Sequence, residues 1–446
     1  MPKTEIFNVK IVVIVFNRGE GYDLNNTIEQ AYINIIKKEL VPAMGCTEPV
    51  AIAFCAAKAK QILNQMPDKV IIEASGNIIK NAKSVIVPNT KGMKGIEVAA
   101  AMGIVAGDSS LGLEVISKVE DNVLVLVKDF MKKVKIEVKT AEQGVLLDIN
   151  VKLIHESDVV SVRIMNQHTN VVLVKHNDKV LFDDIHPSDV LSNLDYDLLN
   201  MRDIYAFSTL GDISELEEVI STQIEYNTAI SKEGLSKDYG ANIGQTILNV
   251  YGHDVRNRSK AKTAAGSDAR MNGSALPVVI NSGSGNQGMT ASLPVIEFAE
   301  ELKVSKEKLY RALILSNLIA IYQKSQIGSL SAFCGAVTAG AASGAAITYL
   351  KGGNYDDVSH TLINALAIAS GIICDGAKAS CAAKIAISVD AGILASDMHD
   401  LGKDFYAGDG IVGVDVDKTI KNIGQLGRVG MKETDKEILY LMSCFD

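Results

Sequence analysis

Three cysteines in the C-terminal half have the type and spacing that most directly indicate chemistry. Cys334, Cys374 and Cys381 are 40 and 7 residues apart, in segments poor in charge and rich in Gly and Ala. Thiolates are the usual ligands of iron–sulfur clusters, and three of them around a cube leave one iron free to bind a substrate as a Lewis acid. Two alternatives stay open. The thiols can simply pack as small apolar groups, or they can bind zinc, although no histidine lies near them and no paired CxxC ribbon is present.

The short spacing of the last two cysteines constrains the backbone between them. Seven residues of unbroken helix rise about 10 Å, which is far for two sulfurs that bind one small cluster. We therefore predict that the run CDGAKASC, residues 374–381, bends near Gly376 and that a helix ends there.

A fourth cysteine lies in the sequence GCTEP, residues 45–49. Gly45 favours a turn, and the three residues after Cys46 are favourable in the first turn of a helix, so Cys46 is expected at a helix N-terminus. The positive end of the helix dipole would lower the thiol pKa from about 8.5 toward neutrality and give a thiolate that acts as a base or nucleophile. A thiol that only packs at a turn is the alternative, and Cys55, among alanines, is expected to pack.

A glycine-rich segment and two cations are candidates for binding a carboxylate. Residues 277–294 contain the pattern GxGxxG, but a dinucleotide site also needs a second strand that ends in an acidic residue, and here Pro294 begins a helical segment instead. Free backbone N–H groups in the turn can bind a carboxylate, and Arg270 can bind one in bidentate form. A structural turn, a surface loop around Arg270 and lysines that only reach solvent are the alternatives. The candidate substrate-binding residues are Ser282, Gly283, Asn286, Gln287, Arg270 and Lys324.

The composition argues against several other functions. The 446 residues have a formal charge of -9, so no overall basic field attracts nucleic acid or an anionic membrane. Six cysteines are too few for a disulfide scaffold and no signal peptide is recognisable, which indicates a reduced, cytoplasmic protein that acts on a small molecule. The sequence has no Walker loop, GxSxG elbow or HExxH pair, which argues against P-loop, serine-hydrolase and histidine-metal chemistry.

Two kinds of sequence pattern, one helical and one typical of strands, predict the elements that must position these residues. A helical pattern runs from residue 26 to 65 with a break at 42–45, and helices resume from residue 200 to the end. Between them the pattern predicts strands, including an antiparallel hairpin with its turn at 166–170. The predicted strands, with a short one near the N-terminus, are residues 11–16, 70–72, 123–127, 134–138, 159–164 and 171–174.

The fold class that follows is α+β. We expect a mainly helical catalytic domain, residues 1–67 plus 186–446, with an inserted α/β module that contains the strands, residues 68–185. The uncharged stretch 325–350 predicts a tightly packed interior pair of helices rather than a membrane span, because it is crowded with Gly, Ala, Ser and Thr. Large helices rich in Ala and Gly often pack across subunits, so the sequence is compatible with a homo-oligomer.

In four motifs the sequence resembles L-cysteine desulfidase and its close bacterial relatives of the iron–sulfur L-serine dehydratase alpha-chain family. The motifs occur in the same order, and the similarity runs from about residue 28 to about residue 440. Their combination is specific to this group. The motifs are GCTEP (45–49), SGSGNQG (282–288), SLSAFCGAV (329–337) and CDGAKASC (374–381).

The resemblance implies a 4Fe–4S cluster held by Cys334, Cys374 and Cys381, a thiol base at Cys46, and no pyridoxal phosphate. It implies that L-cysteine and water become pyruvate, ammonia and hydrogen sulfide, with the substrate sulfur on the free iron. The serine dehydratases are similar too, but their second and third cluster cysteines are farther apart, which favours the desulfidase branch. L-Serine deamination, a non-enzymatic iron or redox sensor, and a metal-free ligand-binding protein are the alternative functions.

Two further expectations come from the wider group. Its strand-rich domain resembles an allosteric substrate-binding fold, which suits residues 68–185 here. A C-terminal cysteine can also cap the free iron, and we assign this role as a hypothesis to Cys444, two residues before the last one.

Overall fold

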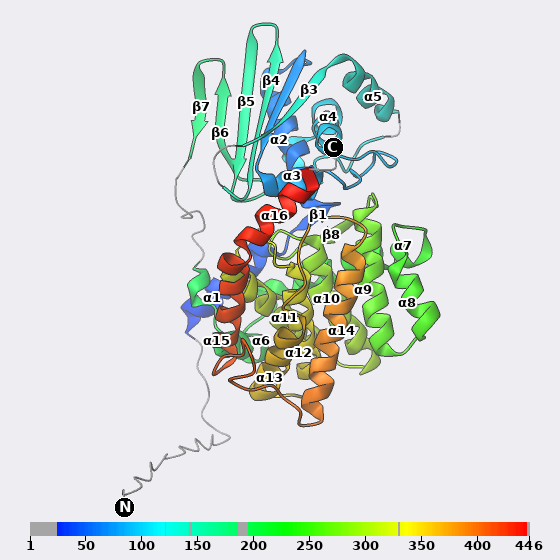
Figure 1. Cartoon of the computed structure of the whole chain (residues 1–446), viewed down its shortest axis with the longest axis vertical. Coiled ribbons are helices and arrows are strands. Elements are labelled where there is room, and N and C mark those ends of the chain that lie inside the picture. The colour runs from blue at the N-terminus through cyan, green and yellow to red at the C-terminus, as the bar shows by residue number, and fades with distance from the viewer. Residues whose placement is uncertain (1–24, 121, 142–144, 186–194, 329–330, 444–446) are drawn as a thin grey trace, which may run out of the picture.

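The computed structural model describes residues 25–120, 122–141, 145–185, 195–328 and 331–443. Figure 1 shows two parts, a sheet with its helices above and a helical body below. The predicted α+β fold class, mainly helical, is therefore confirmed. The strand predicted at 11–16 and the hypothesis for Cys444 lie outside the described residues. The division at residues 67/68 and 185/186 stays a prediction.

A six-stranded sheet forms the centre of the upper part, with the strand order β3-β2-β4-β5-β6-β7. The pair β2 and β3 is parallel, and all other neighbours in the sheet are antiparallel. The predicted hairpin is confirmed, because β5 and β6 are antiparallel neighbours on either side of residues 166–170. The strands are β2 (Lys69–Ala74), β3 (Lys135–Thr140), β4 (Asp148–His155), β5 (Asp158–Met165), β6 (Val171–His176) and β7 (Lys179–Asp183).

The strand predicted at residues 123–127 is wrong, because Val123–Lys133 form helix α5. Leu124 and Val127 are buried on one face of this helix, whereas Val125 and Leu126 are exposed. Packing of an amphipathic helical face has therefore overridden the weak strand preference of β-branched residues. Strands β4 and β7 were not predicted from the sequence.

Helices α2 (Thr47–Leu63) and α4 (Ile96–Ala106) share a hydrophobic core with the sheet. They approach each other closely, since a Cβ added to Gly103 would lie 2.1 Å from the carbonyl oxygen of Ala53. Because Cys46 is the N-cap of α2, the packing of α2 on the sheet fixes the position of this thiol.

The helical body surrounds a second hydrophobic core. Within it α12 and α14 approach so closely that Cβ atoms added to Gly340 and Gly344 would each lie 2.4 Å from a backbone oxygen of α14. The helices of the body are α1 (Asn26–Glu39), α6 (Met201–Leu210), α7 (Glu217–Ser236), α8 (Ile243–Tyr251), α9 (Val255–Met271), α10 (Gly285–Glu301), α11 (Lys306–Ile327), α12 (Gly335–Leu350), α13 (Tyr355–Ala369), α14 (Cys381–Asp400) and α15 (Val416–Gln425).

Three local expectations for the body need correction. The stretch 325–350 contains the end of α11 and the single buried helix α12, not a pair of helices. Pro294 lies inside α10, which begins nine residues earlier at Gly285. The polar run around Arg270 is not a surface loop, because it forms the buried C-terminal end of α9. Among the described residues, none of the helices combines the length and apolar character needed to span a bilayer.

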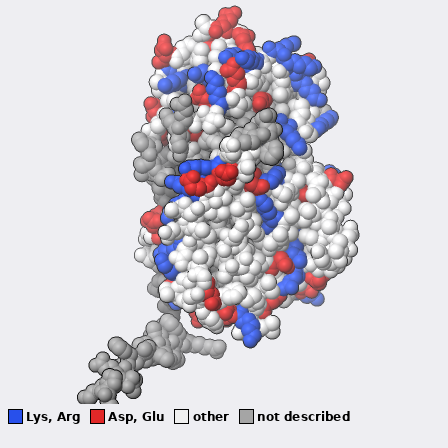
Figure 2. Space-filling view, in the orientation of Figure 1, with Lys and Arg blue, Asp and Glu red and all other residues white. Residues whose placement is uncertain are grey.

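Two elements connect the parts. Strand β1 (Pro42–Met44) pairs antiparallel with β8 (Pro277–Val279). Helix α16 (Lys432–Ser443) lies at the boundary and contacts helix α3 (Gly76–Ala82), as Figure 1 shows in red and blue. On the face drawn in Figure 2, acidic and basic side chains are interspersed on the upper part, and the front of the lower part is largely uncharged.

Candidate functional site

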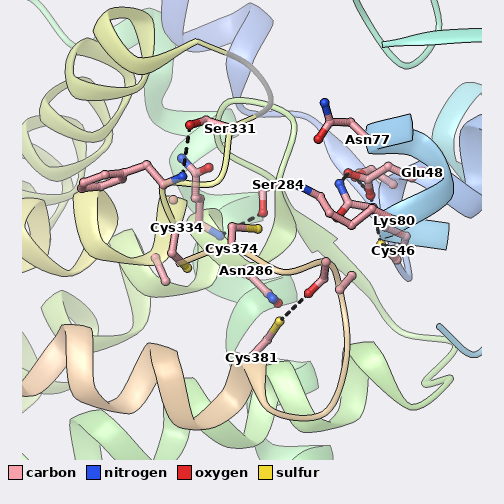
Figure 3. A pocket seen from close by; sticks show the side chains of 18 of the residues that line it. Cys46, Glu48, Asn77, Lys80, Ser284, Asn286, Ser331, Cys334, Cys374 and Cys381 are labelled. Carbon is pink, nitrogen blue, oxygen red and sulfur yellow. Dashed lines mark hydrogen bonds between the residues drawn. The ribbon is translucent and has the colours of Figure 1, made fainter. Parts of the chain in front are cut away.

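A small cavity between the two parts is lined by most of the predicted site residues. It offers about 110 Å³ to water-sized molecules. Figure 3 shows Cys334, Cys374 and Cys381 on one side of it, and Cys46 and Glu48 on the other. The predicted residues that line the cavity are Cys46, Arg270, Asn286, Gln287, Lys324, Cys334, Cys374 and Cys381.

Backbone hydrogen bonds bring together two of the three cysteines Cys334, Cys374 and Cys381, the grouped cysteines. The N–H of Cys374 donates to the carbonyl oxygen of Ala332 at 2.6 Å, and the N–H of Cys334 donates to that of Ile372 at 3.1 Å. The third, Cys381, begins α14 after a turn at Gly376, where φ is +94°. The predicted bend near Gly376 is thus confirmed, and it needs glycine because the left-handed backbone region penalises any Cβ. The predicted helix end at this point is wrong, because α13 already ends at Ala369 and the next helix begins only at Cys381.

The three grouped thiols line the same small cavity, and the pKa values of Cys334 and Cys381 are raised. Burial and then the neighbouring Cys374 raise the pKa of Cys334 to about 12, and burial also raises the pKa of Cys381. Such thiols ionise when a cation binds them. In the described part of the chain, no three His, Cys, Asp or Glu side chains form a group that could hold one metal ion. Cysteine thiolates are nevertheless the donor type that iron–sulfur clusters use.

Four helices begin at this cavity. The N-caps of α2, α10, α12 and α14 are Cys46, Ser284, Cys334 and Ser380. The first N–H groups of a helix lack partners within it, and the positive end of the helix dipole favours anions. These helix N-termini therefore favour the binding of an anionic group, such as a carboxylate, in this cavity.

Cys46 caps α2 as predicted, but its pKa is raised rather than lowered. Its side chain is buried, and Sγ donates a hydrogen bond to Glu48 Oε2 at 3.0 Å. Burial is the largest cause of the raised pKa and the charge of Glu48 adds to it, whereas Arg270 acts in the opposite direction. The predicted low-pKa thiolate is therefore wrong, because desolvation and an adjacent carboxylate outweigh the helix dipole.

Glu48 is a buried carboxylate for which the sequence predicted only a helix-starting role. Asn81 Nδ2 donates to its Oε1 at 3.1 Å, and the Thr47 hydroxyl lies 3.1 Å from Oε2. Although burial raises it, His168 and the hydrogen bonds from Cys46 and the backbone lower the pKa of Glu48 to about 2. In the sequence, the signal for the pair of Cys46 and Glu48 is the motif GCTEP, in which an acidic residue follows a cysteine by two positions.

Arg270 and Gln287 present unpaired polar atoms to the cavity. Arg270 is buried and its Nη1 donates to Asn286 Oδ1 at 3.2 Å, but its Nε has no hydrogen-bond partner among the described residues, and neither has Gln287 Nε2. A Cβ on Gly285 would lie 2.4 Å from Arg270 Nε, so a larger residue at the start of α10 would displace the Arg270 side chain. A buried donor without a partner costs about 1–3 kcal/mol, which a bound carboxylate would offset.

A larger cavity of about 430 Å³ adjoins the small one. Ser282 and Gly283 line this larger cavity rather than the one with the cysteines. Lys324 is buried between the two, and burial lowers its pKa. The residues that line both cavities are Glu48, Ser284, Gln287 and Lys324.

Helix α3 contributes three lining residues that sequence reasoning missed, Asn77, Lys80 and Asn81. Lys80 is buried, and its Nζ lies 2.5 Å from Asp435 Oδ1 on α16. The spacing of the three residues puts them on one helical face, which is the signal that the sequence offered.

Comparison with known proteins places these residues in a family context. A family model described as serine dehydratase alpha chain matches residues 112–440, which include the three grouped cysteines but not Cys46. A UPF0597 protein of Desulfitobacterium hafniense is 53% identical over 93% of this chain and 96% of its own length. Those of Lachnoclostridium phytofermentans and Treponema denticola are 51% and 45% identical, over 92% and 94% of this chain and 98% and 99% of theirs. The chain therefore belongs to the serine dehydratase alpha chain family.

Proposed function

We propose that the chain is an iron–sulfur lyase that converts L-cysteine and water into pyruvate, ammonia and hydrogen sulfide. The proposal rests on one observation, the arrangement of four cysteines around a small cavity, three grouped and the fourth hydrogen-bonded to a carboxylate. Membership of the serine dehydratase alpha chain family supports the lyase class. The family description also makes L-serine the second candidate substrate.

The grouped thiols of Cys334, Cys374 and Cys381 are the proposed ligands of a 4Fe–4S cluster. When bound through three thiolates, such a cluster supplies a Lewis-acidic iron that polarises a leaving group. The support for this assignment is the raised pKa of two of these thiols, which a cation would offset, and the helix N-termini that favour anions.

Arg270, Asn286 and Gln287 are the proposed site for the substrate carboxylate. Their unpaired or weakly paired donors face the cavity beside the N-terminus of α10. Neutralising the carboxylate makes the neighbouring α-proton more acidic, and removal of one such donor typically costs about 3–4 kcal/mol in the transition state. Lys324 is proposed to contact the same group from the wall between the cavities. Ser282 and Gly283 are proposed to line the approach.

Cys46 is the proposed base for the α-proton. Its buried thiol must first lose a proton, and both Arg270 and the ammonium group of an incoming amino acid favour the thiolate. Loss of the α-proton and of sulfide gives aminoacrylate, which water hydrolyses to pyruvate and ammonia. The cavity is small, and its wall from α3 is held to α16 by the ion pair of Lys80 and Asp435.

Anaerobic reconstitution with iron and sulfide tests the proposal. We expect about four irons per chain by stoichiometry of one cube. With L-cysteine the loaded protein should release sulfide and pyruvate in equal amounts. Faster turnover of L-serine would reverse the order of the two substrates. Iron uptake without pyruvate from either amino acid would contradict the lyase and favour a sensor.

Two regulatory roles stay predictions. Residues 68–185 are proposed as an allosteric binding module, and Cys444 as a cap of the cluster, although Cys444 lies outside the described residues. A Cys444→Ala variant with unchanged resting activity and cluster spectrum would contradict the cap.

A further inference from the structure

Glu48 connects the thiol of Cys46 to the larger cavity. Its Oε2 accepts the hydrogen bond from Cys46 Sγ at 3.0 Å, and its Oε1 lies 4.0 Å from His168 Nε2. Cys46 lines only the small cavity, His168 lines only the larger one, and Glu48 lines both. The carboxylate is therefore in the wall between a buried thiol and an imidazole that faces the more open space.

We propose that Glu48 and His168 form a proton path from Cys46 to the larger cavity. The inference rests on the proposed function, in which Cys46 removes the α-proton, and Glu48 is a positioning residue that acts through this thiol. The S–H bond of Cys46 breaks as an O–H bond forms on Glu48 Oε2. The neutral carboxyl group is only a transient species, because the pKa of Glu48 lies far below that of Cys46. After the proton has moved to the side of Oε1, this O–H bond breaks as an N–H bond forms on His168 Nε2, and the imidazole then releases the proton to water. No electrons are transferred.

The surroundings of His168 fit the receiving end of this path. It lies in the turn between β5 and β6, and its Nε2 is buried without a hydrogen-bond partner among the described residues. The loop at Gly283 confines the ring, because a Cβ there would lie 3.1 Å from His168 Cε1. Two polar atoms 4.0 Å apart come within hydrogen-bonding distance after a small side-chain rotation.

The carboxylate itself is held by neutral groups. Asn81 donates to Oε1, and the Thr47 hydroxyl lies within hydrogen-bonding distance of both Oε2 and the carbonyl oxygen of Gly283. These contacts fix the orientation of the side chain but do not cancel its charge. Thr47 also couples the position of Glu48 to the glycine-rich loop.

The charged groups around the path are few. Lys324 on α11 approaches Glu48, Arg270 on α9 acts on Cys46, and Glu39 on α1 faces His168. A purely electrostatic role of Glu48 predicts the opposite outcome from a proton path. Its charge raises the pKa of Cys46, so its removal alone would favour the thiolate and increase activity at neutral pH.

Glu48→Gln separates the two roles, because the amide keeps the shape and can still accept a hydrogen bond but has no proton to relay. In the cluster-loaded variant we expect unchanged iron content and cluster absorbance, little change in KM, and kcat lower by about 10²-fold or more. In cluster-free protein, alkylation of Cys46 by iodoacetamide, followed by peptide mass spectrometry, should move to lower pH. A kcat that stays within about twofold of the parent, or rises, overturns the path.

His168→Ala gives a second, independent test by chemical rescue. We expect kcat to fall by about tenfold or more and to recover when imidazole is added, since the larger cavity can admit it. His176→Ala is the matched control, because His176 belongs to the same hairpin but pairs with Asp158 at 2.6 Å, away from both cavities. We expect no effect of His176→Ala and no response of this control to imidazole.

The outcomes distinguish the path from the proposed function. An active parent whose His168→Ala variant loses activity without recovery in imidazole overturns the path alone, as does an unimpaired Glu48→Gln. A cluster-loaded parent that releases neither sulfide nor pyruvate overturns the proposed function, and the path with it.

Discussion

The two walls of the small cavity use cysteine in opposite ways. On the helical wall, Cys334, Cys374 and Cys381 lie close together, and Lys384 brings positive charge to Cys334 and Cys381. On the opposite wall a single thiol, Cys46, donates a hydrogen bond to a carboxylate. Grouped thiols next to positive charge are suited to binding a metal cluster as thiolates, whereas a thiol paired with an acid is suited to holding and passing a proton.

This difference arises from the elements that supply each wall. The helical wall is built from loops that end where α12 and α14 begin, and close packing of these two helices fixes the loops. The opposite wall comes from α2 and α3, which belong to the hydrophobic core of the sheet. The residue type is the same on both walls, and its role is set by its neighbours.

The largest expected effect is loss of the cluster from the helical wall. Cys374→Ala removes one of the three proposed cluster ligands. We therefore expect loss of cluster absorbance, low iron content and no measurable lyase activity. Cys55→Ala is the matched control, because Cys55 is buried against the sheet and its Sγ contacts the carbonyl oxygen of Val162. A Cys374→Ala protein that retains the iron content of Cys55→Ala would remove the distinction between the walls.

On the opposite wall we expect loss of rate without loss of metal. Cys46→Ala should keep the cluster absorbance and iron content, while kcat falls by about 10²–10⁴-fold, the usual contribution of a general base. Exchange of the substrate α-hydrogen with deuterated water should fall in parallel with kcat. A variant that loses its iron would instead place Cys46 among the cluster ligands.

The pH profile sharpens the contrast, because the pKa of Cys46 is raised well above that of an ordinary thiol. Below its pKa the thiolate fraction increases tenfold per pH unit, so kcat/KM of the parent should rise by about 100-fold between pH 7 and 9. A low-pKa thiolate of the kind expected from the helix dipole alone would give a flat profile over this range. Initial rates in buffers of constant ionic strength distinguish the two.

Part of the helical wall could be predicted because one of its signals is local. The bend near Gly376 follows from helix geometry, whereas the assignment of all three cysteines to one cluster depends on the resemblance to a family. The hairpin of β5 and β6 was predicted for the same reason, since its alternating strands and polar turn are contiguous.

The opposite wall could be predicted only in part, because its chemistry depends on tertiary contacts. Cys46 was placed correctly at a helix N-terminus, but the sign of its pKa shift depends on burial and on the rotamer of Glu48, which a local pattern does not encode. His168 reaches Glu48 from more than a hundred residues away along the chain. The helix at 123–127 was missed for a related reason, since only packing shows which of its apolar residues are buried.

A smaller effect is expected at the carboxylate site between the walls. Arg270→Gln removes the cation but leaves an amide of hydrogen-bonding ability, so KM should rise by about 10–100-fold, equivalent to the 1.5–3 kcal/mol of a hydrogen bond to a charged group. The value of kcat should fall as well, because Arg270 also favours the Cys46 thiolate. Arg256→Gln is the matched control, because Arg256 lies on the same helix, α9, and pairs with Asp397 near the surface. Equal KM values for the two variants would contradict the role of Arg270.

The smallest expected effect comes from the loop between α13 and α14, which contains Cys374 and in which two glycines form an internal control. Gly376 has a φ of +94°, and a Cβ there would lie 2.5 Å from the carbonyl oxygen of Lys80, on the opposite wall. Gly376→Ala should therefore cost about 1–3 kcal/mol of unfolding free energy through backbone strain and displace the loop from α3. Gly371→Ala should be nearly neutral, because a Cβ at that position meets no atom within 4 Å. Chemical denaturation of both cluster-free proteins measures the difference. Iron retention after gel filtration of the cluster-loaded proteins then tests whether the contact between the walls supports the cluster. A lower iron content in Gly376→Ala than in Gly371→Ala would show that it does.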